Sequence, residues 1–450
     1  MKIALAGQYS KASVVRSSDR AITHYALDSR RCVSGSLFFT LRGKNSSGID
    51  YLKEAESNGA VAVLVHTEDI QRALNETSCA VLASDDVFQA LMNLATAYRA
   101  LFPHVRTIGI TGSTGKSTTK EAVGKIASAL GPTTMTSGNL NSEYGLALSI
   151  MNLNSETKYG VFELGIDHPG EMERMTRMAS PTIGVLTNIG NAHLESMGSR
   201  EVIAREKAKI FHPGIEAGFI SRHSLYGHLI QTLSPVELIR YSTRDVSAID
   251  LGLDGWQISY QGVSFRIKAV GKHLLEDVAG AIRVGAYLGA RPVDIAHALE
   301  DFEPLVGRST VRTSRVTIIN DTYNASLDST RSIIRYLSRL SWSGRKNAVL
   351  GPMKELGAES KQAHLEIAKT LIQSTFTKHF LYGREMEEAY QTIKREKGKE
   401  RVSFTQDFEE LEGMVRDEVT AGDLVLLKGS RVVQMERLIP TIERGVALHG

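Results

Sequence analysis

The sequence predicts an α/β fold divided among three domains. Its 450 residues suggest about three domains, because a domain usually holds about 100 to 200 residues. From residue 107 onward, short apolar runs alternate with helical segments, a pattern typical of mainly parallel sheets. A glycine-rich stretch at residues 107–121 joins one apolar run to a helix. We expect the domains to span residues 1–102, 103–305 and 306–450.

The composition excludes several classes of protein. Hydrophobic residues make up 42% of the chain, but no apolar run is long enough for a membrane span or a signal peptide. The net charge of +3 gives no field typical of nucleic-acid or membrane binding. Two cysteines provide neither a disulfide framework nor a zinc site. We therefore expect a cytoplasmic monomer without a nucleic-acid partner.

The first 102 residues predict a small α/β domain. Residues 37–41 and 61–65 are expected to be strands, and residues 51–58 a connecting helix that ends at Gly59. A longer helix is expected at residues 87–101, before a linker at Phe102-Pro103-His104.

Two basic clusters of this first domain lie near predicted turns. They are Asp28-Ser29-Arg30 and Arg42-Gly43-Lys44. An arginine there could hold a pyrophosphate through its two parallel N–H groups. A solvated basic loop is the alternative.

The stretch Thr107–Glu121, TIGITGSTGKSTTKE, predicts a phosphate-binding loop that opens a helix. Its glycines let backbone N–H groups approach an anion, Lys116 can reach terminal phosphates, and the Ser117 hydroxyl can bind Mg²⁺. An ordinary glycine-rich turn is the alternative, but such a turn rarely places Lys-Ser-Thr-Thr at a helix start. The predicted phosphate contacts are Gly112, Ser113, Thr114, Gly115, Lys116, Ser117 and Thr118.

The loop begins a central, P-loop-type, mainly parallel sheet. Its predicted strands are residues 107–111, 159–163, 182–188 and 218–222. Ligands of such sheets lie beyond the carboxyl ends of the strands, where Glu163 and His193 are expected beside Ser117. These side chains predict a Mg²⁺ site next to the phosphates. A capping glutamate and an ordinary loop histidine are the alternative.

Lys207 is expected to point inward from a helix capped by Ser199. It shares a helical stripe with Ile203 and Ile210, while Arg205 and Lys209 fall on the opposite face. A buried lysine loses hydration, so its neutral amine becomes available for chemistry such as carbamylation by CO₂. The alternative is a lysine whose stem packs while its ammonium reaches solvent.

Further polar loops and a second series of strands follow. Asn139 and Asn141 belong to a polar loop ahead of a predicted helix at residues 146–152, and residues 245–270 predict a β-rich insert. A C-terminal, Rossmann-like α/β domain begins near residue 306. Its predicted strands are residues 316–320, 347–350, 378–382 and 424–427, and its polar strand ends are Asp321, Asn324 and Lys428–Arg431.

Taken together, these segments resemble the Mur ligase family, the ATP-dependent enzymes that form amide bonds in peptidoglycan synthesis, and so in cell-wall biogenesis, cell shape and division. The resemblance covers nearly the whole chain and favours the branch that adds D-alanyl-D-alanine to a UDP-N-acetylmuramoyl-tripeptide. The motifs that carry it are ALDSR, GSLFFTLRG, TGSTGKSTTKE, GNLNSEYG, FELG, TNIGNAHLE, DTYNASLDS, MKELG and GDLVLLKGSR.

The resemblance implies a role for each predicted site residue. The Gly112–Thr118 loop would bind ATP phosphates, Ser117 and Glu163 would hold Mg²⁺, and His193 would support a second Mg²⁺. Lys207 matches a lysine that is carbamylated in some members and could then bind the metal. The implied nucleotide contacts are Asn324 and Arg308, the implied contacts to the UDP group are Asp28, Ser29 and Arg30, and those to the muramoyl-peptide are Asn139 and Asn141.

The implied reaction forms an acyl phosphate from ATP and the peptide carboxylate, which the amine of D-alanyl-D-alanine then attacks.

One departure from the family concerns the pattern G-x-H-N-x-x-N, which reads Gly271-Lys272-His273-Leu274 with Asp277 in this chain. Two alternatives remain. One is a carboxylate-amine ligase of the folylpolyglutamate or another cell-wall type, and the other is a non-catalytic nucleotide-binding protein.

Overall fold

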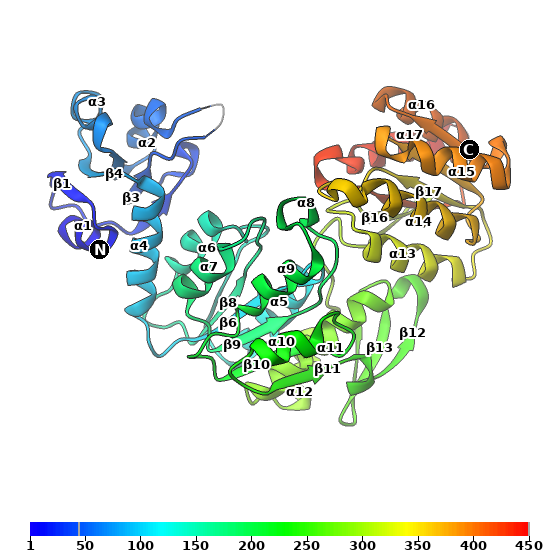
Figure 1. Cartoon of the computed structure of the whole chain (residues 1–450), viewed down its shortest axis with the longest axis horizontal. Helices are drawn as coiled ribbons and strands as arrows, with labels where there is room; N and C mark the ends of the chain where they lie inside the picture. Colours follow the sequence, from blue (N-terminus) through cyan, green and yellow to red (C-terminus); the bar gives the residue numbers. More distant parts are fainter. Residues whose placement is uncertain (44–45, 449–450) are drawn as a thin grey trace.

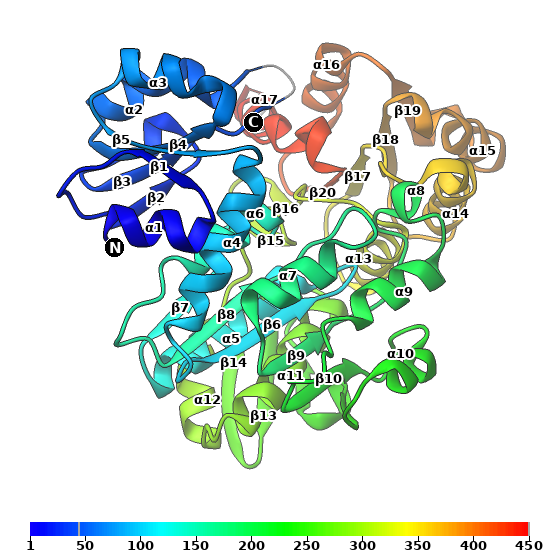
Figure 2. The same ribbon diagram turned by 60° about the vertical axis from the view of Figure 1, so that its left-hand side comes forward.

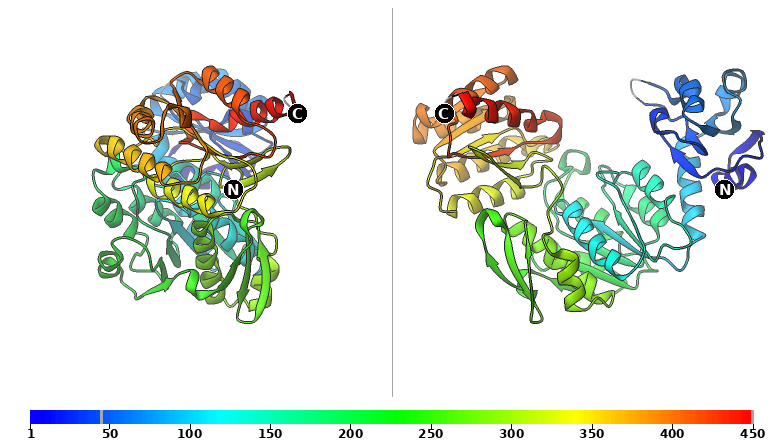
Figure 3. Two further views of the ribbon diagram at one scale, coloured as in Figure 1. Left: turned by 90° about the vertical axis from the view of Figure 1, so that its right-hand side faces the viewer. Right: turned by 180° about the vertical axis from the view of Figure 1, so that it is seen from behind.

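The computed structural model describes residues 1–43 and 46–448 and contains four sheets in a chain of mixed α/β structure. The N-terminal and C-terminal sheets stand at opposite ends of a central region, and two opposite views agree on this arrangement (Figures 1 and 3). None of the helices in the described part of the chain has the length and hydropathy needed to cross a membrane.

The N-terminal sheet has the order β1-β5-β4-β3-β2, and only β1 is antiparallel to its neighbour. The predicted strands and connecting helix of this region are confirmed with shifted bounds as β3, β4 and α2. Lys44, from one predicted basic cluster, lies outside the described residues. The elements are α1 (Ile3–Ser10), β1 (Ser13–Arg16), β2 (His24–Ala26), β3 (Ser36–Phe39), α2 (Leu52–Ser57), β4 (Ala60–His66), α3 (Ile70–Glu76) and β5 (Ala80–Ser84).

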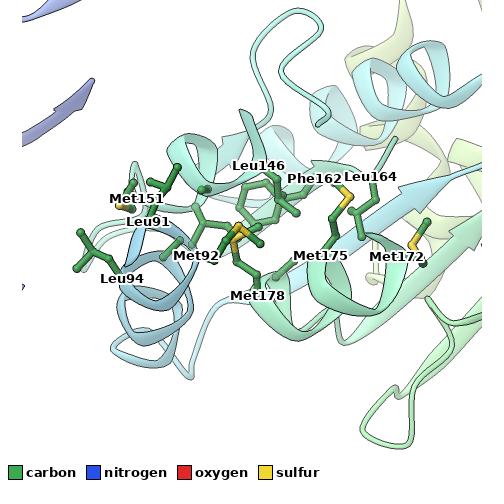
Figure 4. Close-up of a cluster of buried hydrophobic side chains, with 14 of the residues drawn as sticks. Leu91, Met92, Leu94, Leu146, Met151, Phe162, Leu164, Met172, Met175 and Met178 are labelled. Carbon is green, nitrogen blue, oxygen red and sulfur yellow. The ribbon is translucent and has the colours of Figure 1, made fainter. Parts of the chain in front are cut away.

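Helix α4 (Val87–Ala100) leads from the N-terminal sheet to the central one (Figure 2). Its apolar face packs on α6 (Glu143–Ile150) and α7 (Glu171–Ala179). Figure 4 shows Met92 of α4 beside Met178 of α7, with Leu91 next to Met151. The buried Arg99 side chain donates to the carbonyl oxygens of Ala179, Phe102 and Val105, and this fixes the start of the central domain.

The central sheet is parallel throughout, in the order β11-β10-β9-β6-β8-β7. Strand β6 therefore lies between β8 and β9, and the loops after these three strands meet at one edge. The predicted strands are confirmed within one to two residues at most ends. They are β6 (Arg106–Thr111), β7 (Thr133–Met135), β8 (Tyr159–Glu163), β9 (Ile183–Leu186), β10 (Ala217–Ser221) and β11 (Leu238–Tyr241).

Two predicted helix bounds in this region are wrong. Helix α6 begins at Glu143 and not at residue 146, because the Ser142 side chain caps it by accepting from Gly145 N. Helix α9 (Arg200–Ala208), capped by Ser199 as predicted, ends before Ile210, which is buried in the following turn. The other helices here are α5 (Lys116–Leu130), α8 (Leu194–Met197), α10 (Gly227–Leu233), α11 (Lys272–Tyr287) and α12 (Pro292–Leu299).

The predicted β-rich insert is confirmed as an antiparallel sheet of β12 (Ser247–Asp250), β13 (Trp256–Tyr260) and β14 (Val263–Ile267). Alternating burial along β13 places Trp256, Ile258 and Tyr260 on the face that packs against the central core.

The C-terminal sheet has the order β15-β16-β20-β17-β18-β19, with only β15 antiparallel, and helices flank it. This arrangement agrees with the predicted α/β layers. Its strands are β15 (Thr310–Thr313), β16 (Thr317–Asp321), β17 (Lys346–Leu350), β18 (Lys378–Tyr382), β19 (Val402–Thr405) and β20 (Leu424–Lys428). Its helices are α13 (Leu327–Arg339), α14 (Ser360–Ile372), α15 (Glu387–Lys397), α16 (Phe408–Glu418) and α17 (Leu438–Leu448).

Candidate active site

The loop between β6 and α5 has the geometry of an anion cradle. Gly112 and Gly115 adopt φ values of +151° and +81°. A Cβ atom at Gly112 would lie 1.9 Å from Thr187 Oγ1, and one at Gly115 would lie 2.2 Å from Asp277 Oδ1. Neither position can therefore carry a side chain. Helix α5 has no side-chain cap and no acidic residue in its first turn, so its N-terminal amides and dipole favour an anion.

Neighbouring strand ends hold the loop in place. Asn188, which follows β9, accepts from Thr114 N at 3.0 Å and donates to Thr114 Oγ1 at 2.7 Å. The Ser113 hydroxyl accepts from Gly190 N at 2.8 Å. Lys116 Nζ donates to Gly112 O at 2.8 Å, and burial lowers the pKa of this ammonium group. These contacts within the protein hold the loop in its cradle shape.

Glu163 joins the polar groups beside this loop. Its carboxylate is fully buried, with Oε2 accepting from Ser117 Oγ at 2.7 Å and Oε1 accepting from Asn141 Nδ2 at 2.7 Å. Arg308, from the segment before β15, donates from Nη2 to Ser117 Oγ at 2.7 Å. The guanidinium carbon of Arg308 lies 4.0 Å from the centre of the Tyr323 ring. A planar cation thus reaches the phosphate loop from the C-terminal side.

His193 lies on the same cavity as Ser117 and Glu163, a cavity of about 290 Å³. Its Nδ1 lies 2.7 Å from Glu355 Oε2 and 3.1 Å from Asp167 Oδ1. Within residues 1–43 and 46–448, no three His, Cys, Asp or Glu side chains converge as a ready metal cluster. The structure therefore brings His193 to the predicted edge of the sheet but pairs it with carboxylates there.

Three family models match consecutive parts of the chain. They are the Mur ligase family catalytic domain at residues 21–107, the Mur ligase middle domain at residues 110–285, and the Mur ligase glutamate ligase domain at residues 307–431. A relative from Treponema pallidum (strain Nichols), named "UDP-N-acetylmuramoyl-tripeptide--D-alanyl-D-alanine ligase", is 31% identical over 436 residues, which cover 94% of this chain and 95% of the relative. The chain belongs to the Mur ligase family.

Solved structures agree with this assignment. A crystal structure of MurF from Acinetobacter baumannii has a TM-score of 0.87 at 26% identity, covering 98% of each chain. MurF ligase from Thermotoga maritima in complex with ADP has a TM-score of 0.78 at 27% identity, covering 96% of this chain and all of that one. The three-domain α/β fold expected from the sequence is thereby confirmed.

Lys207 of this Mur ligase is buried in the described structure. Its side chain is 1% exposed, and Nζ has no hydrogen-bond partner among the described residues. Burial first, and repulsion from Lys116 second, hold its pKa well below the ordinary lysine value. The alternative of a lysine whose ammonium reaches solvent is therefore wrong. Arg205 and Lys209, by contrast, pair with Glu201 and Glu206.

The C-terminal sheet contributes a buried ion pair to the cleft. Lys428 Nζ donates to Asp321 Oδ2 at 2.6 Å and to the carbonyl oxygen of Asn324 at 3.0 Å. Asn324 is itself exposed and lines the main cavity. These contacts bring the predicted strand ends of β16 and β20 together beside the phosphate loop.

The predicted substrate residues are more dispersed. Asn141 lines the main cavity, whereas Asn139 is exposed and does not. The Asp28-Ser29-Arg30 turn lies in the N-terminal domain, away from this cavity. Asp28 accepts from Arg30 through both carboxylate oxygens, which lowers the pKa of Asp28, and the buried Ser29 donates to Glu54. The arginine is therefore paired within its own turn in this structure.

Sequence patterns alone do not identify several residues of the site. Lys120 is fully buried and donates from Nζ to Thr136 O at 2.7 Å, so it fixes the polar loop that follows. Asp277 packs against Gly115, and burial raises the pKa of its carboxyl to about 8. Lys120 lies one helical turn after Lys116, which could have suggested a related role. Nothing local in the sequence places Asp277 or Glu355 beside the loop.

Proposed function

We propose that this Mur ligase uses ATP to join D-alanyl-D-alanine to UDP-N-acetylmuramoyl-tripeptide, releasing ADP and phosphate in peptidoglycan precursor synthesis. The observation that carries the proposal is the Ser117 hydroxyl, which hydrogen-bonds both Glu163 and Arg308 at the start of the phosphate loop. The name of the Treponema pallidum relative supports this choice of substrates.

The phosphate loop would hold ATP through the backbone amides of Gly112–Thr118 and the N-terminus of α5. Lys116 can exchange its bond to Gly112 O for the terminal phosphate, because a single backbone carbonyl is all that holds its ammonium group in the described structure. Arg308 can contact the same phosphate from the opposite side. Asn324, exposed on the cavity, is positioned for the nucleoside.

The residues beside the loop fit Mg²⁺. Ser117 Oγ and Glu163 Oε2 are buried oxygen atoms 2.7 Å apart, and Mg²⁺ prefers oxygen atoms as ligands. When bound there, Mg²⁺ would neutralise charge on the phosphates. His193 would support a second ion, which requires that it leave Glu355.

Lys207 would supply an anionic group beside these ions. Burial lowers the pKa of this unpartnered amine and so favours its neutral form, which can attack CO₂, forming an N–C bond and releasing one proton to give a carbamate. The carbamate would then place negative charge near the ammonium group of Lys116. Without the carbamate, repulsion from Lys116 disfavours the charged form of Lys207.

The proposed reaction would use these residues as follows. An oxygen of the tripeptide carboxylate attacks the γ-phosphorus, the bond to ADP breaks, and Lys116 and Arg308 stabilise the charge on the transferring group. The neutral amine of D-alanyl-D-alanine then attacks the acyl carbon, and the proton that it loses passes to the departing phosphate. Phosphate departs with its oxygen from the tetrahedral intermediate. Domain closure around the cleft would exclude water, which otherwise hydrolyses the acyl phosphate.

We assign the remaining predicted residues to the two ends of the substrate. Asp28, Ser29 and Arg30 would hold the UDP group, and Asn139 and Asn141 would contact the muramoyl-peptide. Because ATP and a UDP-linked precursor are metabolites of the cytoplasm, we infer that the enzyme works there, as a monomer.

Phosphate release tests the proposal directly. UDP-N-acetylmuramoyl-tripeptide, ATP and D-alanyl-D-alanine are supplied together and then each omitted in turn, with glutamate as an alternative amine. We expect release only with all three, and none with the Lys116→Ala variant, whose thermal unfolding should match the parent. Release that depends on glutamate would instead assign a different amine, and ATP binding without product would assign a non-catalytic protein.

A further inference from the structure

A second cavity lies outside the active site, between the antiparallel insert and α13, two elements that Figure 1 shows next to each other. Its volume is about 840 Å³, within the range of small-molecule sites. Tyr336 of α13 closes one side by donating to Asp250 Oδ1 at 2.6 Å and to Gly252 O at 2.9 Å. The cavity therefore joins an element of the central domain to one of the C-terminal domain.

Four cations line this cavity. Arg331, Arg335 and Arg339 recur every four residues along α13, so they project from one face of the helix, and Lys272 contributes from the start of α11. None of the four has an ion-pair or hydrogen-bond partner within the described ranges. Glu366, the carboxylate whose pKa Arg331 helps to lower, is instead bonded to Lys369 at 2.8 Å.

The acidic residues of the cavity do not balance these charges. Asp250 and Asp328 are the two carboxylates in its lining, and Asp250 is engaged by Tyr336. A row of like charges at four-residue spacing destabilises a helix unless counter-charges are bound. The cavity thus carries an excess of positive charge that its own lining does not neutralise.

Trp256 and the first residue of α11 also lie at the wall of this cavity. The Trp256 side chain is 8% exposed, and its buried Nε1 has no hydrogen-bond acceptor in the part of the chain described. Helix α11 begins at Lys272 without a side-chain cap, but its next residues, His273 and Leu274, line the active site. The unpaired positive charge of Arg331, Arg335, Arg339 and Lys272 is therefore the feature that favours an anionic ligand.

We propose that this cavity is a second anion site that binds a phosphorylated small molecule and so links the insert to α13. It is distinct from the phosphate loop, because the cavity shares none of the residues that line the active site. The two are nonetheless neighbours, since Ser332 of the cavity lies 3.3 Å from His273 Nδ1, which faces the active site. An occupant would hold the central and C-terminal domains together next to the nucleotide.

Calorimetric titration of the full chain with inorganic tripolyphosphate tests this proposal. We expect two binding events in the parent, one lost in Lys116→Ala and the other lost in the double variant Arg335→Gln with Arg339→Gln. Loss of two unpaired arginines should weaken the second event at least about tenfold. The charge-matched control, Arg395→Gln with Lys397→Gln on α15, should keep both events.

Titrations with ATP, UDP and tripolyphosphate distinguish a nucleotide ligand from an inorganic phosphate. The compound that binds most tightly at the arginine-dependent site shows which of these two classes the site prefers. If the thermal unfolding temperature of the double variant differs from that of the parent, the measurement is repeated with the single variants Arg335→Gln and Arg339→Gln. A parent with only the Lys116-dependent event, or an arginine variant that keeps both events at parental affinity, would overturn the proposal.

Discussion

Arg308 Nη2 donates a 2.7 Å hydrogen bond to Ser117 Oγ, although the two residues are 191 positions apart in the chain. This bond places a C-terminal cation against the first turn of the phosphate-binding helix. Since Ser117 also bonds Glu163, one hydroxyl connects the predicted metal ligand to a cation of the C-terminal segment.

Replacing Arg308 by Lys should lower kcat/KM by about a hundredfold, because an ammonium lacks the planar fork that can hold Ser117 and a phosphate together. Phosphate release under the complete reaction mixture measures this. Arg312→Lys is a matched control, since Arg312 lies on β15 and pairs with Glu443 at the surface. Equal rates for the Arg308 variant and the control would show that Arg308 does not act on the phosphate.

Replacing Glu163 by Gln should raise the Mg²⁺ concentration needed for half-maximal activity and lower kcat by at least about a hundredfold. The amide keeps the size of the side chain but loses the negative charge. A Mg²⁺ titration of phosphate release is the measurement, and Glu216→Gln, near the opposite ends of the strands, is the control. An unchanged Mg²⁺ midpoint would argue against Glu163 as a ligand.

Replacing Lys207 by Ala should abolish ligation, and small carboxylic acids such as acetate should restore part of it by occupying the place of the carbamate. The prediction rests on the buried, unpartnered Nζ. Activity is measured with and without acetate, next to Lys209→Ala, whose lysine pairs with Glu206 at 2.6 Å and should be dispensable. A folded Lys207 variant that acetate does not rescue would leave carbamylation without support.

Replacing Asp277 by Asn should remove a pH dependence of stability. The folded-state pKa of about 8 exceeds the ordinary value of 3.8, so between these values the folded protein binds a proton that the unfolded chain has lost. The free energy of unfolding of the parent should therefore fall as pH rises from about 4 to about 8 and level off above.

Denaturant unfolding at pH 5 and pH 8 checks this expectation. The gain in the free energy of unfolding from Asp277→Asn should be larger at pH 8 than at pH 5. The difference should be about a few kcal/mol, because a pKa difference between the folded and unfolded states converts directly into free energy. A Glu276→Gln variant controls for the neighbouring carboxylate, whose repulsion contributes to the raised pKa. Parallel pH profiles for the parent and the Asp277→Asn variant would contradict a protonated Asp277.

Much of the site is predictable because its signals are local. The run from Gly112 to Ser117 specifies its own turn and helix start, and the parallel topology then brings the ends of β6, β8 and β9 to one edge. Glu163 and His193 follow from this topology. Lys207 follows from helical spacing, although spacing does not decide whether its amine is buried or solvated.

The three-domain α/β class, the phosphate loop and the strand-end residues could all be read from the chain alone, because each depends on periodicity or on short spacing. The folded structure was needed to show that Asp277 presses on Gly115, that Glu355 holds His193, and that three arginines of α13 face the insert. These relationships join residues from separate elements. Whether such residues come into contact depends on how whole domains pack, and no local pattern of side chains encodes the distance between them.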